Sequence, residues 1–251
     1  VEITGSIENA VGTWDAASQG AVSGEEIARR PVQRPAEVLE VVPGMIVSQH
    51  SGDGKASQYF LRGYNLDHGT DFATWVAGMP VNMPTHAHGQ GYTDLNFLIP
   101  ELISRVQYNK GPYFAEDGDF SSVGSARISY AEQLPESIAS LTAGQNAFKR
   151  AVFAGAPEAG PGRMVYGLEY QYADGPWDTP EKFHKMNGVL RYAQGSLANG
   201  FNVTAMGYSA NWNATDQIPL RAVQNGQIGR FGAIDPSDGG RSDRSAQRAA
   251  E

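Results

Sequence analysis

The residues best able to do chemistry in this sequence are histidines and aspartates in two polar, glycine-containing segments, 65–71 and 83–94. They are Asp67, His68, Asp71, His86, His88 and Asp94. His86 and His88 are separated by one alanine and could present two imidazoles to a metal ion or a metal chelate, because imidazole is a common metal ligand. Two other interpretations stay open: histidines that only make hydrogen bonds within a polar loop, and direct contact with an organic ligand.

Methionine and aromatic side chains lie near these segments. Tyr92, Phe114 and Phe120 could stack on a ligand, with core packing as the equal alternative. Met79 and Met83 could bind a soft metal, although methionine beside a strand more often fills space in a core.

Composition excludes several other kinds of site. The absence of cysteine removes disulfides, thiolate zinc sites and cysteine nucleophiles. The net charge is −8, and no dense run of Lys or Arg could follow a phosphate backbone, so we expect no nucleic-acid partner. His86, His88 and nearby aspartates could form a hydrolytic metal site, but the sequence has no HExxH, GxSxG or phosphate-loop motif. We therefore expect that the protein is not an enzyme.

The first half of the chain predicts a small α+β domain. Residues 1–24 are small and polar and predict a flexible lead segment. A helical turn is expected over 25–30 and a helix over 35–42, because Pro35 suits a first turn and Pro43-Gly44 ends the pattern. Short apolar runs broken by Gly and Pro predict strands at 45–47, 59–61, 72–76, 102–108 and 126–130.

The second half predicts long antiparallel strands. In RMVYGLEYQY (163–172), apolar and aromatic residues alternate with polar ones, which predicts a strand with an apolar face opposite a polar face. Further strands are expected at 137–144, 148–156, 185–194 and 201–212. Tyr170, Tyr172, Trp177, Tyr208 and Trp212 fall near strand ends, where an aromatic girdle would lie. Alternation alone leaves two interpretations open, a membrane barrel and a soluble antiparallel β-domain.

Four stretches of the first half resemble a known family in the family's own order. They are RPAEVLEVVPGMIV (34–47), YFLRGYN (59–65), WVAGMPVN (75–82) and ELISRVQYNKGPYFAEDGDFSSVGSARI (101–128). Together they resemble the plug of TonB-dependent outer-membrane receptors. Ala77 stands where the family often has an acidic residue, and Lys110 where it usually has arginine, which keeps the charge but loses the bidentate fork.

The resemblance implies an α+β plug domain followed by antiparallel transmembrane β-barrel strands. The expected division is a flexible lead over 1–24, the plug domain over 25–133, and over 134–251 the N-terminal part of a barrel with about five strands and a long extracellular loop. A family barrel has about 22 strands. We therefore expect an incomplete barrel in this chain, from a longer receptor or a truncated gene product.

The family resemblance also implies a function. It implies energy-coupled uptake of a scarce ligand across the outer membrane of a Gram-negative cell, most often a ferric siderophore or another metal chelate. No cofactor is expected, and any metal belongs to the transported ligand. The implied partners are the TonB energy-transducing complex, reached through the N-terminal segment, outer-membrane lipid, and the small-molecule or metal-chelate ligand. The alternative is a truncated, non-transporting fragment or a plug-like ligand-binding module.

Particular residues are candidates for these roles. Ligand contact is expected at the loop residues Asp67, His68, Asp71, His86, His88 and Tyr92, with His86 and His88 as the candidate metal-binding pair. Contact between plug and barrel falls on Arg62 and Lys110, which would pair with carboxylates of the barrel wall. The first residues, VEITGS (1–6), resemble the end of a TonB box.

Overall fold

Two compact units make up the described chain. The structure is a computed structural model that describes residues 16–49, 52–196, 199–215 and 217–234, and the backbone of 241–250. One unit holds the described residues up to Ser48 together with Ala56–Ala131, and the other holds Gln49–Lys55 with the described residues from Glu132 onward. Among the described residues, no helix has the length and apolar character needed to cross a membrane.

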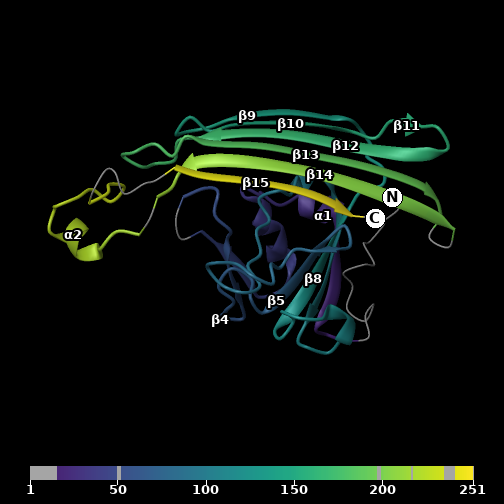
Figure 1. Ribbon diagram of the computed structural model, residues 1–251, viewed down its shortest axis with the longest axis horizontal. Helices are drawn as coiled ribbons and strands as arrows, with labels where there is room; N and C mark the ends of the chain where they lie inside the picture. Colours follow the sequence, from purple (N-terminus) through teal and green to yellow (C-terminus); the bar gives the residue numbers. More distant parts are fainter. Residues whose placement is uncertain (1–15, 50–51, 197–198, 216, 235–240, 251) are drawn as a thin grey trace, which may run out of the picture. The chain divides into compact units, whose positions relative to one another are not determined.

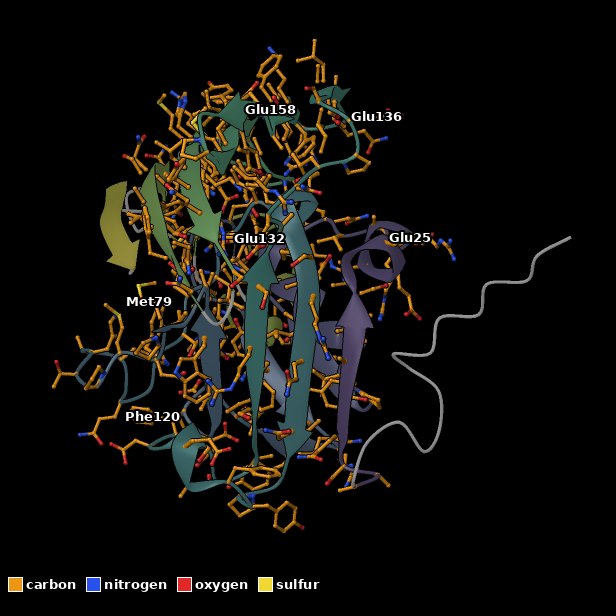
Figure 2. The ribbon with its side chains drawn as sticks, turned by 90° about the vertical axis from the view of Figure 1, so that its right-hand side faces the viewer. Glu25, Met79, Phe120, Glu132, Glu136 and Glu158 are labelled. Atoms are coloured by element: carbon orange, nitrogen blue, oxygen red, sulfur yellow. The ribbon has the colours of Figure 1, made fainter. Side chains whose placement is uncertain are left out.

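The first unit is built on a mixed five-stranded sheet in the order β1-β7-β8-β5-β6. β5 and β8 pair in parallel and the other pairs are antiparallel. Figure 2 shows β1, in purple, beside the paler β7 and β8. The strands are β1 Gln19–Ser23, β5 Phe72–Val76, β6 Met79–Pro80, β7 Ile103–Lys110 and β8 Gly124–Tyr130.

A second, smaller sheet and several short helices complete this unit. The sheet has the order β2-β3-β4, with β2 at Met45–Ser48, β3 at Gln58–Leu61 and β4 at Tyr64–Asn65. The helices are α1 Gly24–Ala28, η2 Pro35–Val41, η3 Pro100–Leu102 and η4 Ala115–Asp117. The strands predicted for this half are confirmed within a few residues at each end.

The predicted helix over 35–42 is present as the 3-10 helix η2. Pro35 stands in its first turn, and the Glu37 carboxylate accepts hydrogen bonds from the backbone N–H groups of Gln33 and Arg34. This arrangement satisfies donors that the start of a helix leaves without partners. Val38 and Leu39 are buried, so η2 contributes to the core of the unit.

Strand β1 lies inside the segment expected to be a flexible lead. Its register pairs Gln19 with Asn109 and Ser23 with Arg105. The order of these five residues comes from the backbone of β7, because small residues such as Gly20 and Ala21 carry little strand preference of their own.

The second unit is an antiparallel sheet that runs β9-β10-β12-β13-β14-β15, with the short β11 paired to β12 (Figure 1). The strands are β9 Ile138–Ala143, β10 Lys149–Gly155, β11 Glu158–Ala159, β12 Gly162–Ala173, β13 Phe183–Gly195, β14 Gly200–Asn213 and β15 Arg241–Ala250. The five long strands expected from alternation are confirmed. The sheet does not close on itself, which agrees with an incomplete barrel.

Many large apolar side chains of this sheet are exposed on one of its faces. Leu168, Met186 and Leu190 are exposed, whereas Glu169 and Lys185 on the opposite face are buried. Other large apolar side chains exposed on these strands are Leu141, Phe153, Tyr170, Phe201 and Val203. This polarity is the reverse of that of a water-soluble sheet and matches a surface that faces hydrocarbon.

Two features of the second half differ from expectation. Tyr208 and Trp212 were expected in an aromatic girdle, but both are buried on the face that carries Lys185 and Asn187. β14 is apolar on both faces, so alternation could not assign them. In addition, residues expected as one long loop after 213 contain the short helix α2, Leu220–Gln224, and the strand β15.

Candidate functional site

One buried side chain holds the two polar segments of the first unit together. The Asn82 amide donates to the carbonyl oxygens of Gly69, Phe72 and Gly91 at 2.9, 3.1 and 3.1 Å. Its Oδ1 accepts from the Thr74 backbone N–H at 2.7 Å. Asn82 therefore links segment 65–71 to segment 83–94.

Backbone contacts fasten the same segments further. The Thr93 N–H donates to the His68 carbonyl at 2.8 Å. Met83 and Tyr92 form an isolated antiparallel bridge that closes the loop between them. The Thr70 hydroxyl also donates to the Gln90 carbonyl. These bonds bring side chains about 20 residues apart in sequence to one place.

Asp67, His68 and His88 form a cluster in which one ligand atom from each lies within 4.8 Å of the others. The Asp67 carboxylate lies 3.3 Å from His88 Nε2 and 3.7 Å from His68 Nε2. The imidazole rings of His68 and His88 meet edge to face, with centroids 4.5 Å apart. His68 is only 5% exposed, whereas Asp67 and His88 are 50% and 48% exposed. The cluster therefore has a buried floor and an open side.

His86 occupies a different position from the one that the His-Ala-His spacing suggests. Its ring stacks on Tyr92 with centroids 3.9 Å apart and an angle of 11° between the planes. Its Nδ1 accepts a hydrogen bond from the backbone N–H of His88 at 3.1 Å. The grouping that the structure produces is therefore His68 with His88 and Asp67, and His86 lines the side of it with Tyr92.

The two other aspartates of these segments have local structural contacts. The Asp71 carboxylate accepts from the Ser122 hydroxyl at 2.5 Å, and Asp94 accepts from the Asn96 backbone N–H at 2.9 Å. Asp94 is buried near Tyr59, and burial, with Asp94 as the next cause, raises the pKa of Tyr59 well above its usual value. Neither carboxylate belongs to the Asp67 cluster of the described residues.

Arg62 and Lys110 lie close enough to influence each other. Partial burial, and next the positive charge of Arg62, lower the pKa of Lys110. The described residues give no ion pair to either side chain. Lys110 lies 5.8 Å from the centre of the Tyr108 ring. Two neighbouring cations would be stabilised by a carboxylate brought from elsewhere.

A second cluster of polar groups lies in the second unit, in the loop 174–182 between β12 and β13. The Glu181 carboxylate accepts from the Asp53 backbone N–H and from the Thr215 hydroxyl, both at 3.3 Å. Thr215 also accepts from the Gly52 N–H at 2.8 Å. Burial, and next the charge of Asp53, raise the pKa of Glu181 to about 7. No pattern in the sequence singles out Glu181, because an acid in a polar loop has no characteristic spacing.

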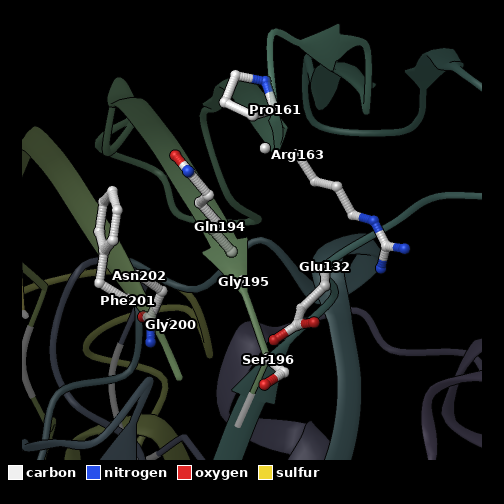
Figure 3. A pocket seen from close by; sticks show the side chains of 11 residues that line it. Glu132, Pro161, Arg163, Gln194, Gly195, Ser196, Gly200, Phe201 and Asn202 are labelled. Atoms are coloured by element: carbon white, nitrogen blue, oxygen red, sulfur yellow. The ribbon is translucent and has the colours of Figure 1, made fainter. Parts of the chain in front are cut away.

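An open pocket of about 440 Å³ lies at the opposite ends of the same strands, beside the turn between β13 and β14 (Figure 3). Arg163, Gln194, Ser196 and Phe201 line it together with Glu132. Glu132 accepts from Arg191 at 3.1 Å and so already has a cationic partner. The pocket therefore offers no cluster of metal-ligating groups comparable to that of Asp67.

Comparison with known proteins defines the class. Residues 15–125 match the family model described as TonB-dependent Receptor Plug Domain. The first unit has the plug fold, and the second has antiparallel strands that match those of TonB-dependent receptor barrels. The chain therefore contains a TonB-dependent receptor plug domain, followed by antiparallel strands whose fold resembles that of TonB-dependent receptors and whose sheet is not closed.

Three individual proteins illustrate the similarity. The chain is 31% identical over 139 residues to "Vitamin B12 transporter BtuB" of Vibrio vulnificus (strain CMCP6), a match that covers 55% of this chain and 22% of that protein. Its fold resembles "Copper transporter OprC", with a TM-score of 0.62, 20% identity, and coverage of 80% of this chain and 32% of that one. It also resembles the ferric enterobactin receptor PfeA of Pseudomonas aeruginosa, with a TM-score of 0.57, 16% identity, and coverage of 79% and 34%. The chain thus spans between a fifth and about a third of the proteins it matches.

Proposed function

We propose that the receptor containing this chain is an outer-membrane transporter that imports a scarce metal chelate with energy supplied through TonB. The observation that carries the proposal is the cluster of Asp67, His68 and His88, with Tyr92 and His86 beside it, on a plug domain. A ferric siderophore is the first candidate for the cargo. Solved neighbours named as copper and ferric enterobactin receptors support a metal-containing ligand.

Location in the outer membrane of a Gram-negative cell is part of the proposal. It is supported by the apolar, exposed face of β12 and β13, where Leu168, Met186 and Leu190 would contact lipid. Burying apolar surface in lipid contributes about 25 cal/mol per Å², while the backbone of each strand is satisfied by its neighbours. An open sheet would still expose strand edges, so the function belongs to a receptor with a closed barrel.

The TonB partner would act on the N-terminal segment. Residues 1–6, which resemble the end of a TonB box, lie outside the described residues. The strand β1, at the other end of that segment, pairs with β7 of the plug sheet. A pull on the N-terminal segment would therefore act first on the β1–β7 hydrogen bonds, which are few enough to break locally.

Arg62 and Lys110 would pair with carboxylates of the closed barrel. Their mutual repulsion in the plug supports this assignment. An acidic partner would offset both the repulsion and the partial burial of Lys110. These pairs would hold the plug until the N-terminal segment is pulled.

The test is uptake by the full-length receptor in an outer membrane. Cells would be given single sources of iron, copper or zinc, each with and without a chelator, and cobalamin as a separate arm. We expect TonB-dependent growth on one metal source, and loss of that growth when His86 and His88 are both replaced by alanine. Growth that is equal with and without TonB would contradict the transporter assignment, and growth rescue by cobalamin alone would contradict a ferric siderophore as the cargo.

A further inference from the structure

We propose that Asp67, His68 and His88 bind a divalent first-row transition-metal ion directly. The inference rests on the proposed function and names the class of its substrate: a metal ion that arrives with exchangeable ligands, in contrast to one sealed inside a siderophore. His68 and Asp67 then become ligands, and His86 becomes part of the wall of the site.

The first support is the hydrogen bond of His68 on the side away from the cluster. His68 Nδ1 lies 3.0 Å from the carbonyl oxygen of Ser57. A carbonyl can only accept, so Nδ1 carries the proton and donates it. In the neutral ring the lone pair is then on Nε2, which lies 3.7 Å from the Asp67 carboxylate. A histidine that ligates a metal through one nitrogen characteristically donates from the other to a carbonyl or carboxylate.

The second support is the electrostatic character of the gap between the three groups. The Asp67 carboxylate can only accept hydrogen bonds, and it faces the Nε2 atoms of both His68 and His88. A cation that enters, with release of any proton held on Nε2, would take the carboxylate and both Nε2 atoms as ligands. The 4.8 Å spread requires a small contraction, because ligand atoms bound at about 2.0–2.2 Å lie closer together.

The third support is the fixed position of two ligands. Asp67 has a left-handed backbone, with φ of 49°, and its N–H donates to the Asn65 side chain at 2.8 Å. His68 is held by Ser57 and by the Thr93 N–H on its own carbonyl. The Asp67 backbone and the His68 ring are thus held in place, and the adjustments on ion entry fall on the exposed side chains of Asp67 and His88.

The donor set decides the class of ion. Two imidazoles and one carboxylate suit zinc, copper(II), nickel or cobalt(II), whereas calcium and magnesium prefer oxygen ligands alone. Three protein ligands leave further coordination positions for small ligands that travel with the ion. The stacked rings of His86 and Tyr92 border these positions and could contact such ligands.

The test is titration of the purified full-length receptor in detergent with Cu²⁺, read by electron paramagnetic resonance. The wild-type receptor is expected to bind one Cu²⁺ with nitrogen hyperfine coupling from two imidazoles, and Zn²⁺ in large excess is expected to compete for the same site. His88→Ala, at an exposed position, and Asp67→Asn, which tolerates the left-handed backbone, avoid disruption of the fold. Each is expected to weaken binding by at least the roughly 10- to 100-fold that follows loss of an outer-shell partner, because a ligand itself is removed.

His184→Gln is the matched control. His184 lies in β13 with its ring edge-on to Tyr172 and is not a member of the cluster. This variant is expected to keep the affinity and spectrum of the wild-type site. The proposal is overturned if the wild type shows no two-imidazole signal, or if His88→Ala and Asp67→Asn bind Cu²⁺ as the wild type does.

Two parallel measurements separate this inference from the proposed function. TonB-dependent uptake of a ferric siderophore by a receptor that lacks the Cu²⁺ signal would overturn the metal-ion site and leave the transporter intact. A Cu²⁺ site that responds to both variants, in a receptor whose uptake is independent of TonB, would uphold the site and refute energy-coupled transport.

Discussion

Asn82 sets the geometry of the candidate site at the scale of one residue. Replacing it with alanine removes donors to three buried carbonyls and the acceptor for Thr74. Each buried group left without a partner costs about 1–3 kcal/mol. We expect Asn82→Ala to loosen segment 83–94, seen as faster limited proteolysis there and weaker Cu²⁺ binding. Unchanged proteolysis would show that the backbone bonds alone hold the loops.

A second prediction at the scale of one residue concerns Glu181: the stability of the folded protein should depend on pH. Its pKa of about 7 in the folded protein exceeds its ordinary value of 4.5. The folded state therefore holds a proton that the unfolded state releases between these values, so stability from this group is present at acidic pH and is lost as pH rises through 7. The difference between 4.5 and about 7 corresponds to about 3 kcal/mol, at about 1.4 kcal/mol for each pKa unit.

The measurement for Glu181 is hydrogen exchange of the Gly52 and Asp53 amides, corrected for intrinsic rates. Protection should fall between pH 5 and pH 8 in the wild type and stay high in Glu181→Gln, which keeps an acceptor but no charge. Thr215→Val serves as the comparison, since it removes the Gly52 contact while leaving Glu181 to titrate. Equal pH dependence in wild type and Glu181→Gln would mean another group is responsible.

At the scale of the element, the exposed apolar face of strand β12 leads us to expect that a charge placed there would destabilise the receptor. Leu168 is 58% exposed and lies beside Gly188 on β13. An arginine at the bilayer midplane of a barrel costs about 2–4 kcal/mol. Leu168→Arg should lower the urea midpoint of the full-length receptor in lipid vesicles, whereas Leu168→Phe should not. Similar midpoints for the two variants would argue that this face meets water.

The opposite face of β12 carries an ion network with its own prediction. Glu169 lies 2.6 Å from Arg150 and 3.0 Å from Lys185, and all of its side chain is buried. Removing one partner of a buried pair costs about 3–5 kcal/mol, because a charge is left uncompensated. Glu169→Ala should therefore lower the free energy of unfolding of the receptor by a similar amount, as measured by urea unfolding. Combining it with Lys185→Met should recover part of the loss, and no recovery would show that the pair does not interact.

At the scale of the whole molecule, the open sheet predicts that the chain printed here does not span a membrane by itself. Its outer strands β9 and β15 present backbone groups with no neighbour on their far sides in the described sheet. Each such group costs several kcal/mol in hydrocarbon. The 251-residue chain expressed alone should show no heat-modifiable migration on gels, whereas the full-length receptor should. A heat-modifiable chain would imply that copies of it close a barrel together.

Local patterns in the sequence determined a large part of this protein. The alternation of Tyr166, Leu168 and Tyr170 with Gly167 and Glu169 fixed both the strand β12 and the polarity of its faces, because side chains of a strand alternate with a period of two. Pro35 with Pro43-Gly44 bounded η2 for an equally local reason. The order of four plug-like segments predicted the plug domain that the family model matches over residues 15–125.

Only the tertiary structure decided which distant residues meet. His68 and His88 come together because Asn82 and Thr93 join two loops, and no spacing in the sequence encodes that contact. The raised pKa of Glu181 likewise depends on its burial beside Asp53, far away in the chain. β1 and β15 gain order from neighbouring backbones, and their own side chains give little signal. Strands and helix ends follow from residues that are close together in the sequence. The candidate site depends instead on packing and desolvation between residues that are far apart in it.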